Sequence, residues 1–283
     1  MDNRTGFRRT GHAFLAAEAR KTLGITGEIH SLAEVPFPLV HTAFGAAVCA
    51  VAVLVRPEVL GLRNSAIAYA SLAVLTALVL SAYDRLVYPR DRQPGVEGLA
   101  LPVAAVGAFG TVLAGVTPLT VRAAAGVVAA LVIGGVPQLA LRRTTEAEGG
   151  TTRLLRDIAG VAVLAPVLVA SASPTLEPRW RFALVGVITL LVSYDALRTD
   201  GLGAGRVALA AVALGAAEAG IAALVSPSTG QLGVRAAMLL VLWYGLRGIA
   251  GSLAARTGRR ALAVLEYGAF VVLALGALRW IAP

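Results

Sequence analysis

Nine apolar runs recur along this chain of 283 residues, and they constrain its fold more than any other feature of the sequence. A helix needs about 20 apolar residues to cross a hydrocarbon layer about 30 Å thick. The runs are continuous and do not alternate between polar and apolar residues, which favours helices over a β-barrel. With only 14% charged residues, the chain is expected to be an all-α membrane protein with nine transmembrane helices. The runs are 37–55, 65–83, 99–116, 121–141, 157–172, 182–194, 207–225, 236–249 and 261–280.

The distribution of lysine and arginine predicts the orientation of these spans, because cytoplasmic loops retain such residues. With a cytoplasmic N-terminus, 18 of the 25 cations fall on the cytoplasmic side and 7 on the other side. The sequence therefore predicts a multi-pass protein of the cell membrane whose N-terminus is cytoplasmic. Most of the excess of cations behind the net charge of +9 lies in the loops that set the membrane orientation. Membrane lipids are therefore expected as partners, and nucleic acid is not.

One transmembrane domain, residues 36–283, is expected to follow a cytoplasmic N-terminal segment, residues 1–35. This segment carries five cations and lacks the apolar stretch of a signal peptide, so the first span is expected to remain in the mature protein. Residues 14–33 form an amphipathic helix that is expected to rest on the cytoplasmic leaflet.

The sequence lacks the residues that several classes of function require. The single cysteine, Cys49, and three histidines leave no plausible zinc, iron-sulfur or bis-histidine haem site. The sequence also has no P-loop, no GxSxG motif and no HExxH motif. Hydrolase chemistry and nucleotide-driven chemistry are therefore not expected.

An internal repeat is indicated by two similar segments, Leu-Ser-Ala-Tyr-Asp at the end of the second span and Leu-Val-Ser-Tyr-Asp at the end of the sixth. Their Tyr-Asp pairs, Tyr83-Asp84 and Tyr194-Asp195, are 111 residues apart, which is about the length of four spans with loops. This spacing predicts a four-helix repeat in one membrane orientation. A pseudo-twofold axis would make the two acidic clusters face each other across a cytoplasmic-side cavity.

Each cluster supplies two aspartates that are candidate metal ligands. Facing carboxylates raise each other's pKa unless a cation lies between them. Mg²⁺ takes one or two carboxylates per ion and completes its octahedron with water and phosphate oxygens. Alternatively, each aspartate caps its helix or pairs with the nearby Arg85 or Arg198. The candidate magnesium ligands and catalytic residues are Asp84, Asp91, Asp195 and Asp200.

In its number of spans, its orientation and its two aspartate clusters, the chain resembles the UbiA superfamily of intramembrane prenyltransferases, whose members have nine helices and a cytoplasmic N-terminus. The family has an NDxxDxxxD motif after its second helix, which residues 83–92 match loosely. Tyr83 stands in place of the asparagine and Val87 in place of the central aspartate. The second motif, DxxGDxxxGxxTL, is matched with a slip of one residue by Asp195, Asp200, Gly205, Arg206 and Leu209.

Basic residues of the family hold the diphosphate, in a YSxxPxRxKR region between the fourth and fifth helices. The segment Pro-Gln-Leu-Ala-Leu-Arg-Arg, residues 137–143, is similar and provides Arg142 and Arg143, although the tyrosine is missing. The following Arg153 and Arg156 also suit the start of the fifth helix. The resemblance implies that Arg142, Arg143, Arg85 and Arg198 bind the substrate diphosphate.

The activity implied by the resemblance is Mg²⁺-dependent transfer of a prenyl group from a prenyl diphosphate to a lipophilic or aromatic acceptor, with release of diphosphate. Two alternatives lie within the family: a terpene cyclase, and a non-catalytic protein that binds or transports a prenyl lipid, which the loss of the central aspartate favours. A third is an unrelated small-solute transporter with proton-coupling carboxyls.

Other residues are candidates for lining the cavity. Tyr83, Tyr88 and Tyr194 would offer ring faces to a carbocation, or form an aromatic belt at the interface. Glu218 and Glu266 lie inside spans, where a carboxyl group is a functional-site hypothesis by default. The pair Trp243-Tyr244 is expected to pack, and glycines of the third and seventh spans, including Gly107, Gly110, Gly215 and Gly220, are expected at close helix approaches.

Overall fold

The computed structural model describes residues 60–87, 90, 93, 95–115, 119–145, 150–171, 178–199, 202–224, 232–254 and 260–281. The predicted N-terminal segment and the first predicted span lie outside these residues. The described part contains eight helices and no strand. The helices are α4 (Leu62–Val87), α5 (Val96–Gly115), α6 (Leu119–Thr145), α7 (Gly150–Ala170), α8 (Pro178–Thr199), α9 (Ala204–Leu224), α10 (Leu232–Ala254) and α11 (Arg260–Ile281).

Each of the last eight apolar runs coincides with one of these helices, so the all-helical prediction is confirmed for the described residues. The two shortest runs, 182–194 and 236–249, become helices of 22 and 23 residues. At their N-terminal ends both helices take in arginines, Arg179 and Arg181 in α8 and Arg235 in α10, because arginine is a good helix former whose long side chain reaches past the apolar part of the helix.

Membrane character is supported by four helices of the described part that are long and apolar enough to cross a bilayer. The segments are Ile67–Leu86, Ala204–Leu224, Gly233–Ala254 and Ala261–Trp280. Shorter apolar stretches occur in α5 (Gly98–Gly110) and α6 (Ala123–Val136).

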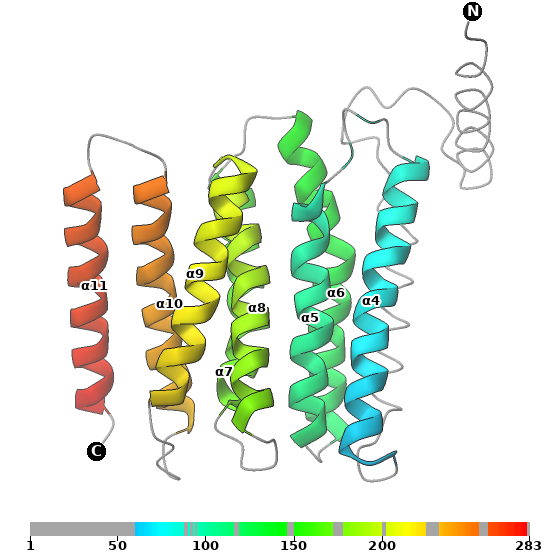
Figure 1. Ribbon diagram of the computed structural model, residues 1–283, viewed down its shortest axis with the longest axis horizontal. Coiled ribbons are helices and arrows are strands. Elements are labelled where there is room, and N and C mark those ends of the chain that lie inside the picture. Colours follow the sequence, from blue (N-terminus) through cyan, green and yellow to red (C-terminus); the bar gives the residue numbers. More distant parts are fainter. Residues whose placement is uncertain are drawn as a thin grey trace, which may run out of the picture.

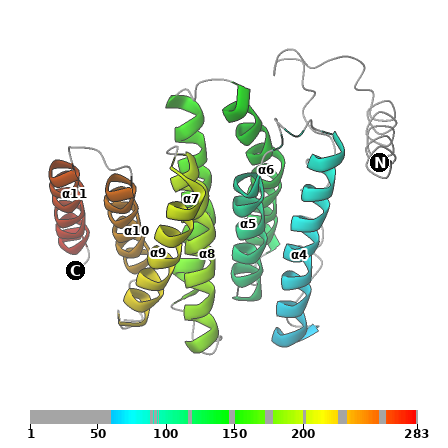
Figure 2. The ribbon, with the colours of Figure 1, turned by 45° about the horizontal axis from the view of Figure 1, so that its top comes forward.

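The helices stand side by side and alternate in direction (Figure 1). Among the described helices, α11 lies at one edge of the bundle and α4 lies near the other, as both views show (Figures 1 and 2). Helix α5 packs against α4, α6, α7 and α8, whereas α11 packs mainly against α10. We call the end at which α4, α6, α8 and α10 terminate the upper end, and the opposite end the lower end (Figure 1).

The main hydrophobic core lies between α5 and its neighbours, and small residues of α5 allow those neighbours to come close. Ala104, Ala105 and Ala108 are fully buried in α5. By contrast, α11 exposes large apolar side chains such as Leu265 and Leu273. Apolar exposure is unfavourable in water but not in lipid, so this face suits a hydrocarbon environment.

Three of the glycines lie at close helix approaches, as predicted. A Cβ atom on Gly110 would lie 2.6 Å from Cγ of Tyr69, and one on Gly107 would lie 2.9 Å from Cδ1 of Ile188. A Cβ atom on Gly215 would lie 2.5 Å from the carbonyl oxygen of Gly186. The expectation for Gly220 is wrong, because nothing lies within 4 Å of the position of its Cβ atom.

Substituting Gly110 by alanine is expected to destabilise the protein by about 1–3 kcal/mol, because the added methyl group overlaps the buried Tyr69 ring. Thermal unfolding in detergent measures the effect. Gly135 of α6 is the matched control, since nothing lies within 4 Å of its Cβ position. There the same substitution is expected to stabilise the helix by about 0.5–1 kcal/mol. Equal effects at both positions would contradict the packing argument.

Candidate functional site

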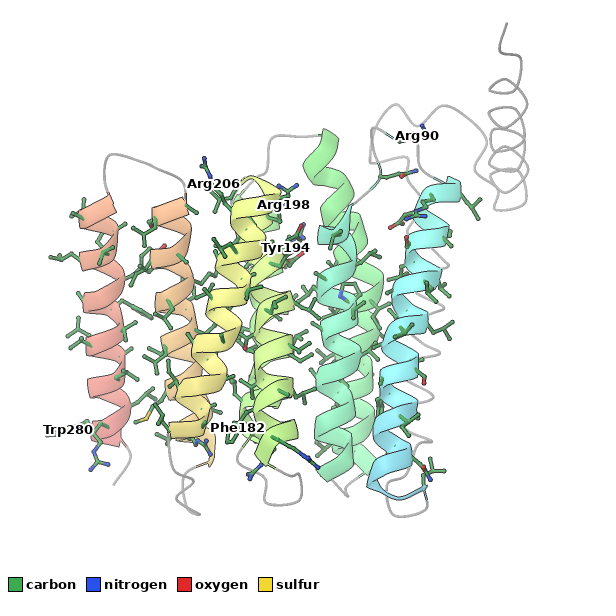
Figure 3. The ribbon with its side chains drawn as sticks, in the orientation of Figure 1. Arg90, Phe182, Tyr194, Arg198, Arg206 and Trp280 are labelled. Carbon is green, nitrogen blue, oxygen red and sulfur yellow. The ribbon has the colours of Figure 1, made fainter. Side chains whose placement is uncertain are left out.

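Polar and charged side chains gather at the upper end of the bundle. Figure 3 labels Tyr194 and Arg198 near the upper end of α8, Arg206 near the start of α9 and Arg90 on the same side of the molecule beyond α4. Asp84 and Asp195 lie near the ends of α4 and α8, and both are buried. The two Tyr-Asp pairs therefore share one end of the fold.

The first pair lies in the last turns of α4. Asp84 directly follows Tyr83 and is buried, whereas Tyr83 is partly buried. Arg85 follows on the exposed side of the helix, where a cation interacts favourably with the negative end of the helix dipole. Helix α5 lies between α4 and α8 and packs against both (Figure 1).

The aspartate of the second Tyr-Asp pair, Asp195, forms an ion pair inside the bundle. Asp195 of α8 is 2% exposed, and its Oδ2 accepts a hydrogen bond of 3.2 Å from Nε of Arg156 on α7. Its Oδ1 accepts a second bond from Nη2 of the same guanidinium. Because the planar guanidinium matches the carboxylate at two points, this pair fixes α7 against α8. Arg156, which was expected at the start of the fifth predicted helix, pairs here with a carboxylate of the protein itself.

This ion pair is part of a larger network that ties α7 to both α8 and α10. Asp157, next to Arg156, accepts a hydrogen bond of 2.7 Å from Nη1 of Arg247 on α10. The Arg247 guanidinium lies 5.9 Å from the ring centroid of Trp243. Nε1 of Trp243 donates a hydrogen bond of 2.9 Å to Oγ of Ser193 on α8. We call this the three-helix network, and its members are Arg156, Asp157, Ser193, Asp195, Trp243 and Arg247.

Asp157, Ser193 and Arg247 were not predicted from the sequence as members of a site. A weak signal was present, since a charged residue inside or at the edge of an apolar run needs a partner across helices. Trp243 was predicted to pack, and it is almost completely buried. Tyr244 also packs, with its ring 6.3 Å from the Tyr267 ring and 5.6 Å from the Phe270 ring.

Some of the remaining candidate residues lie within the described part of the chain and others lie outside it. Arg142 and Arg143 lie in the last turn of α6 at the upper end, but their side chains are outside the described part, as are Asp91, Asp200 and Tyr88 altogether. Arg198 donates a hydrogen bond of 2.7 Å to the carbonyl oxygen of Leu202. Within the described residues, no three acidic, histidine or cysteine side chains form a group that would hold a metal ion. Magnesium binding by the four aspartates therefore stays a prediction.

The two carboxyl groups inside the spans have different environments. Glu218 of α9 is only 1% exposed, and neither of its carboxylate oxygens has a hydrogen-bond partner. It lies on the buried face of α9, together with Leu214 and Gly215. Glu266 of α11 is exposed. Of these two carboxyl groups, only Glu218 is internal, and its hydrogen bonds are unmet.

Replacing Glu218 by methionine is expected to raise the free energy of unfolding by about 1–3 kcal/mol, because a carboxyl group without partners costs free energy on burial. Methionine has a similar length and carries no group that needs a hydrogen bond. The same substitution at the exposed Glu266 is the control, with an expected change within about 0.5 kcal/mol. Thermal unfolding in one detergent compares both variants. A destabilised Glu218→Met protein would show that the carboxyl group has a partner that the structure lacks.

The likeness to the UbiA superfamily depends on the degenerate aspartate motifs and on the number of spans, and it stays a prediction. The described part of the chain is all-helical, as an α-helical membrane protein would be. No protein-family model matches the chain, and neither a curated protein nor a solved structure matches it.

Proposed function

We propose that the protein is an intramembrane prenyltransferase-like enzyme with nine spans and a cytoplasmic N-terminus. It binds the head group of a prenyl diphosphate at the upper end and transfers the prenyl chain to a lipophilic acceptor. The observation that carries the proposal is that α4, α6 and α8 terminate at one end of an apolar helical bundle. These are the helices that bear the two Tyr-Asp pairs and the Arg142-Arg143 pair.

The chemistry of the substrate suits this end of the bundle. A prenyl diphosphate has a highly charged head and a long apolar tail, so its site needs cations at a membrane surface and apolar walls below them. In this proposal, Arg142, Arg143 and Arg198 would provide guanidinium donors for the phosphate oxygens. The apolar helices provide walls that shield an allylic cation from water.

The aspartates have different roles in this proposal. Mg²⁺ would neutralise the departing diphosphate. Asp84, together with Asp91 and Asp200, would hold it. Asp195 is held by Arg156, so its role is to fix the end of α8, where Tyr194 and Arg198 face the head group.

A second candidate is a non-catalytic protein that binds or moves a prenyl lipid. The Asp195–Arg156 ion pair favours it, because one of the four acids of the family pattern is already neutralised by a protein cation. Val87, in place of the central aspartate, removes another acid.

Release of inorganic diphosphate from prenyl diphosphates distinguishes the two candidates. Purified protein with Mg²⁺ is assayed with substrates from geranyl diphosphate to long-chain polyprenyl diphosphates. Asp84→Asn is expected to abolish release, whereas Glu266→Gln, which removes an exposed acid of α11, is expected to retain it. Size-exclusion chromatography checks that both variants are folded. Absence of release with every substrate, combined with Mg²⁺-independent lipid binding that survives Asp84→Asn, would establish the non-catalytic function instead.

A further inference from the structure

Two arginines lie at the lower end of the bundle, opposite the proposed prenyl diphosphate site. Arg181 lies in the first turn of α8 and Arg235 in the first turn of α10. Helices α8 and α10 contact each other, so the two first turns belong to neighbouring helices. Figure 3 labels Phe182, the residue after Arg181, at this end of α8.

Arg235 is buried with unmet hydrogen-bonding capacity. The residue is only 7% exposed, and Nη2 donates a hydrogen bond of 2.7 Å to the carbonyl oxygen of Ala222 at the end of α9. Its Nε and Nη1 atoms have no hydrogen-bond partner. Arg181 reaches in the same way towards the end of α7, where Nη1 lies 3.5 Å from the carbonyl oxygen of Ser171. A buried guanidinium with unpaired N–H groups is costly, since a group of this type is normally paired with an anion.

Helix ends of both signs meet here. Each arginine uses one nitrogen on a carbonyl at the negative C-terminal end of α7 or α9, and each stands in the first turn of its own helix, where anions are preferred. Neither α8 nor α10 has an acidic residue in its first turn. No aspartate or glutamate occurs between Leu224 and Arg235, and the residues that lead into α8 include one acid, Glu177, and two arginines, Arg179 and Arg181. Along the sequence, the starts of these two helices therefore carry more cations than acids.

We propose that Arg181 and Arg235 form a binding site for a phosphate group at the lower end of the bundle. Guanidinium groups bind phosphate oxygens through several N–H bonds, and Arg235 has two nitrogens available to donate. The two helix N-termini favour the negative charge. The phosphate belongs either to the head group of an anionic lipid or to free inorganic phosphate, because both present the same oxygens to the site.

Ligand-dependent thermal unfolding of the full chain tests the site. In one arm, inorganic phosphate is titrated into detergent-solubilised protein at constant ionic strength, with chloride as the comparison. In the other arm, protein in nanodiscs of phosphatidylglycerol is compared with protein in nanodiscs of phosphatidylcholine. A ligand that binds only the native state raises the unfolding temperature, and the concentration dependence gives an apparent Kd. The arm that shows stabilisation identifies the source of the phosphate.

Arg235→Gln is expected to weaken this binding by about tenfold or more, because it removes a charged donor. Arg235→Lys keeps the charge but loses the planar donor group, so its affinity is expected to lie between those of Arg235→Gln and the unaltered protein. Arg279→Gln is the matched control, since it removes a cation from the exposed last turn of α11 at the same end. If Arg235→Gln does not fold, Arg181→Gln serves the same comparison, because Arg181 is only partly buried. Equal stabilisation of Arg235→Gln and the unaltered protein, or an equal loss in Arg279→Gln, would overturn the proposal.

Discussion

Replacement of Asp195 by leucine is expected to destabilise the protein by about 3–5 kcal/mol. Arg156 and Asp195 are both almost completely buried, and the carboxylate accepts two hydrogen bonds from the guanidinium. Removing the acid leaves the Arg156 charge inside the bundle without the carboxylate that neutralises it. The converse change, Arg156→Leu, is expected to have a similar effect for the same reason.

Removing both partners is expected to be far less damaging than removing either one. Burying an ion pair costs the desolvation of two charges, and a pair of leucines avoids this cost. The free energy of unfolding of the variant Arg156→Leu/Asp195→Leu is therefore expected to be close to that of the unaltered protein, or to exceed it by about 1–4 kcal/mol. Denaturation of the four proteins in one detergent completes a double-mutant cycle. Additive losses in the double variant would show that the two side chains act independently and that the ion pair does not hold α7 against α8.

The double variant also separates the structural role of Asp195 from a role in catalysis. If Asp195 only fixes the end of α8, the folded double variant is expected to retain diphosphate release. If Asp195 is a magnesium ligand, release is lost although the protein is stable. A stable variant is needed for this comparison, because the single substitution at Asp195 changes folding and any metal binding together.

Apolar run length predicted the described helices well, because bilayer thickness fixes a minimum span and the protein has few charges to interrupt it. The site was less predictable, because pairing across helices depends on which faces meet. Asp195 pairs with Arg156, which is 39 residues earlier in the sequence, and Asp157 pairs with Arg247, which is 90 residues later. Sequence spacing favours partners on the same helix, such as Arg198 for Asp195. It does not show which faces of α7 and α10 contact other helices.

The same limitation explains the glycines and the intramembrane acids. Gly215 and Gly220 are both glycines of the same apolar run, yet only Gly215 faces α8. Glu218 and Glu266 both interrupt apolar runs, yet only Glu218 turns into the bundle. The sequence identifies such residues as exceptional, and the helix packing decides which of them require an explanation.

Trp243 is expected to be the largest single contributor of apolar packing to the three-helix network. It is 1% exposed and is among the largest fully buried side chains of the described residues. Trp243→Ala would open a cavity between α8 and α10 and leave Ser193 without its indole donor. The expected loss is about 3–5 kcal/mol. Trp243→Phe keeps most of the ring volume and removes mainly the hydrogen bond, so a loss of about 1 kcal/mol is expected.

Trp280 provides the matched control for this substitution, because it is a tryptophan of the same chain that lies 89% exposed near the end of α11. Trp280→Ala removes the same side chain without creating a cavity, and its expected effect on unfolding in detergent is within about 0.5 kcal/mol. Intrinsic tryptophan fluorescence follows the unfolding of both variants. A large loss in Trp243→Ala with a small loss in Trp243→Phe would assign the stabilisation to packing between the helices. Equal losses in the two would assign it to the Ser193 hydrogen bond, since that interaction is what both substitutions remove.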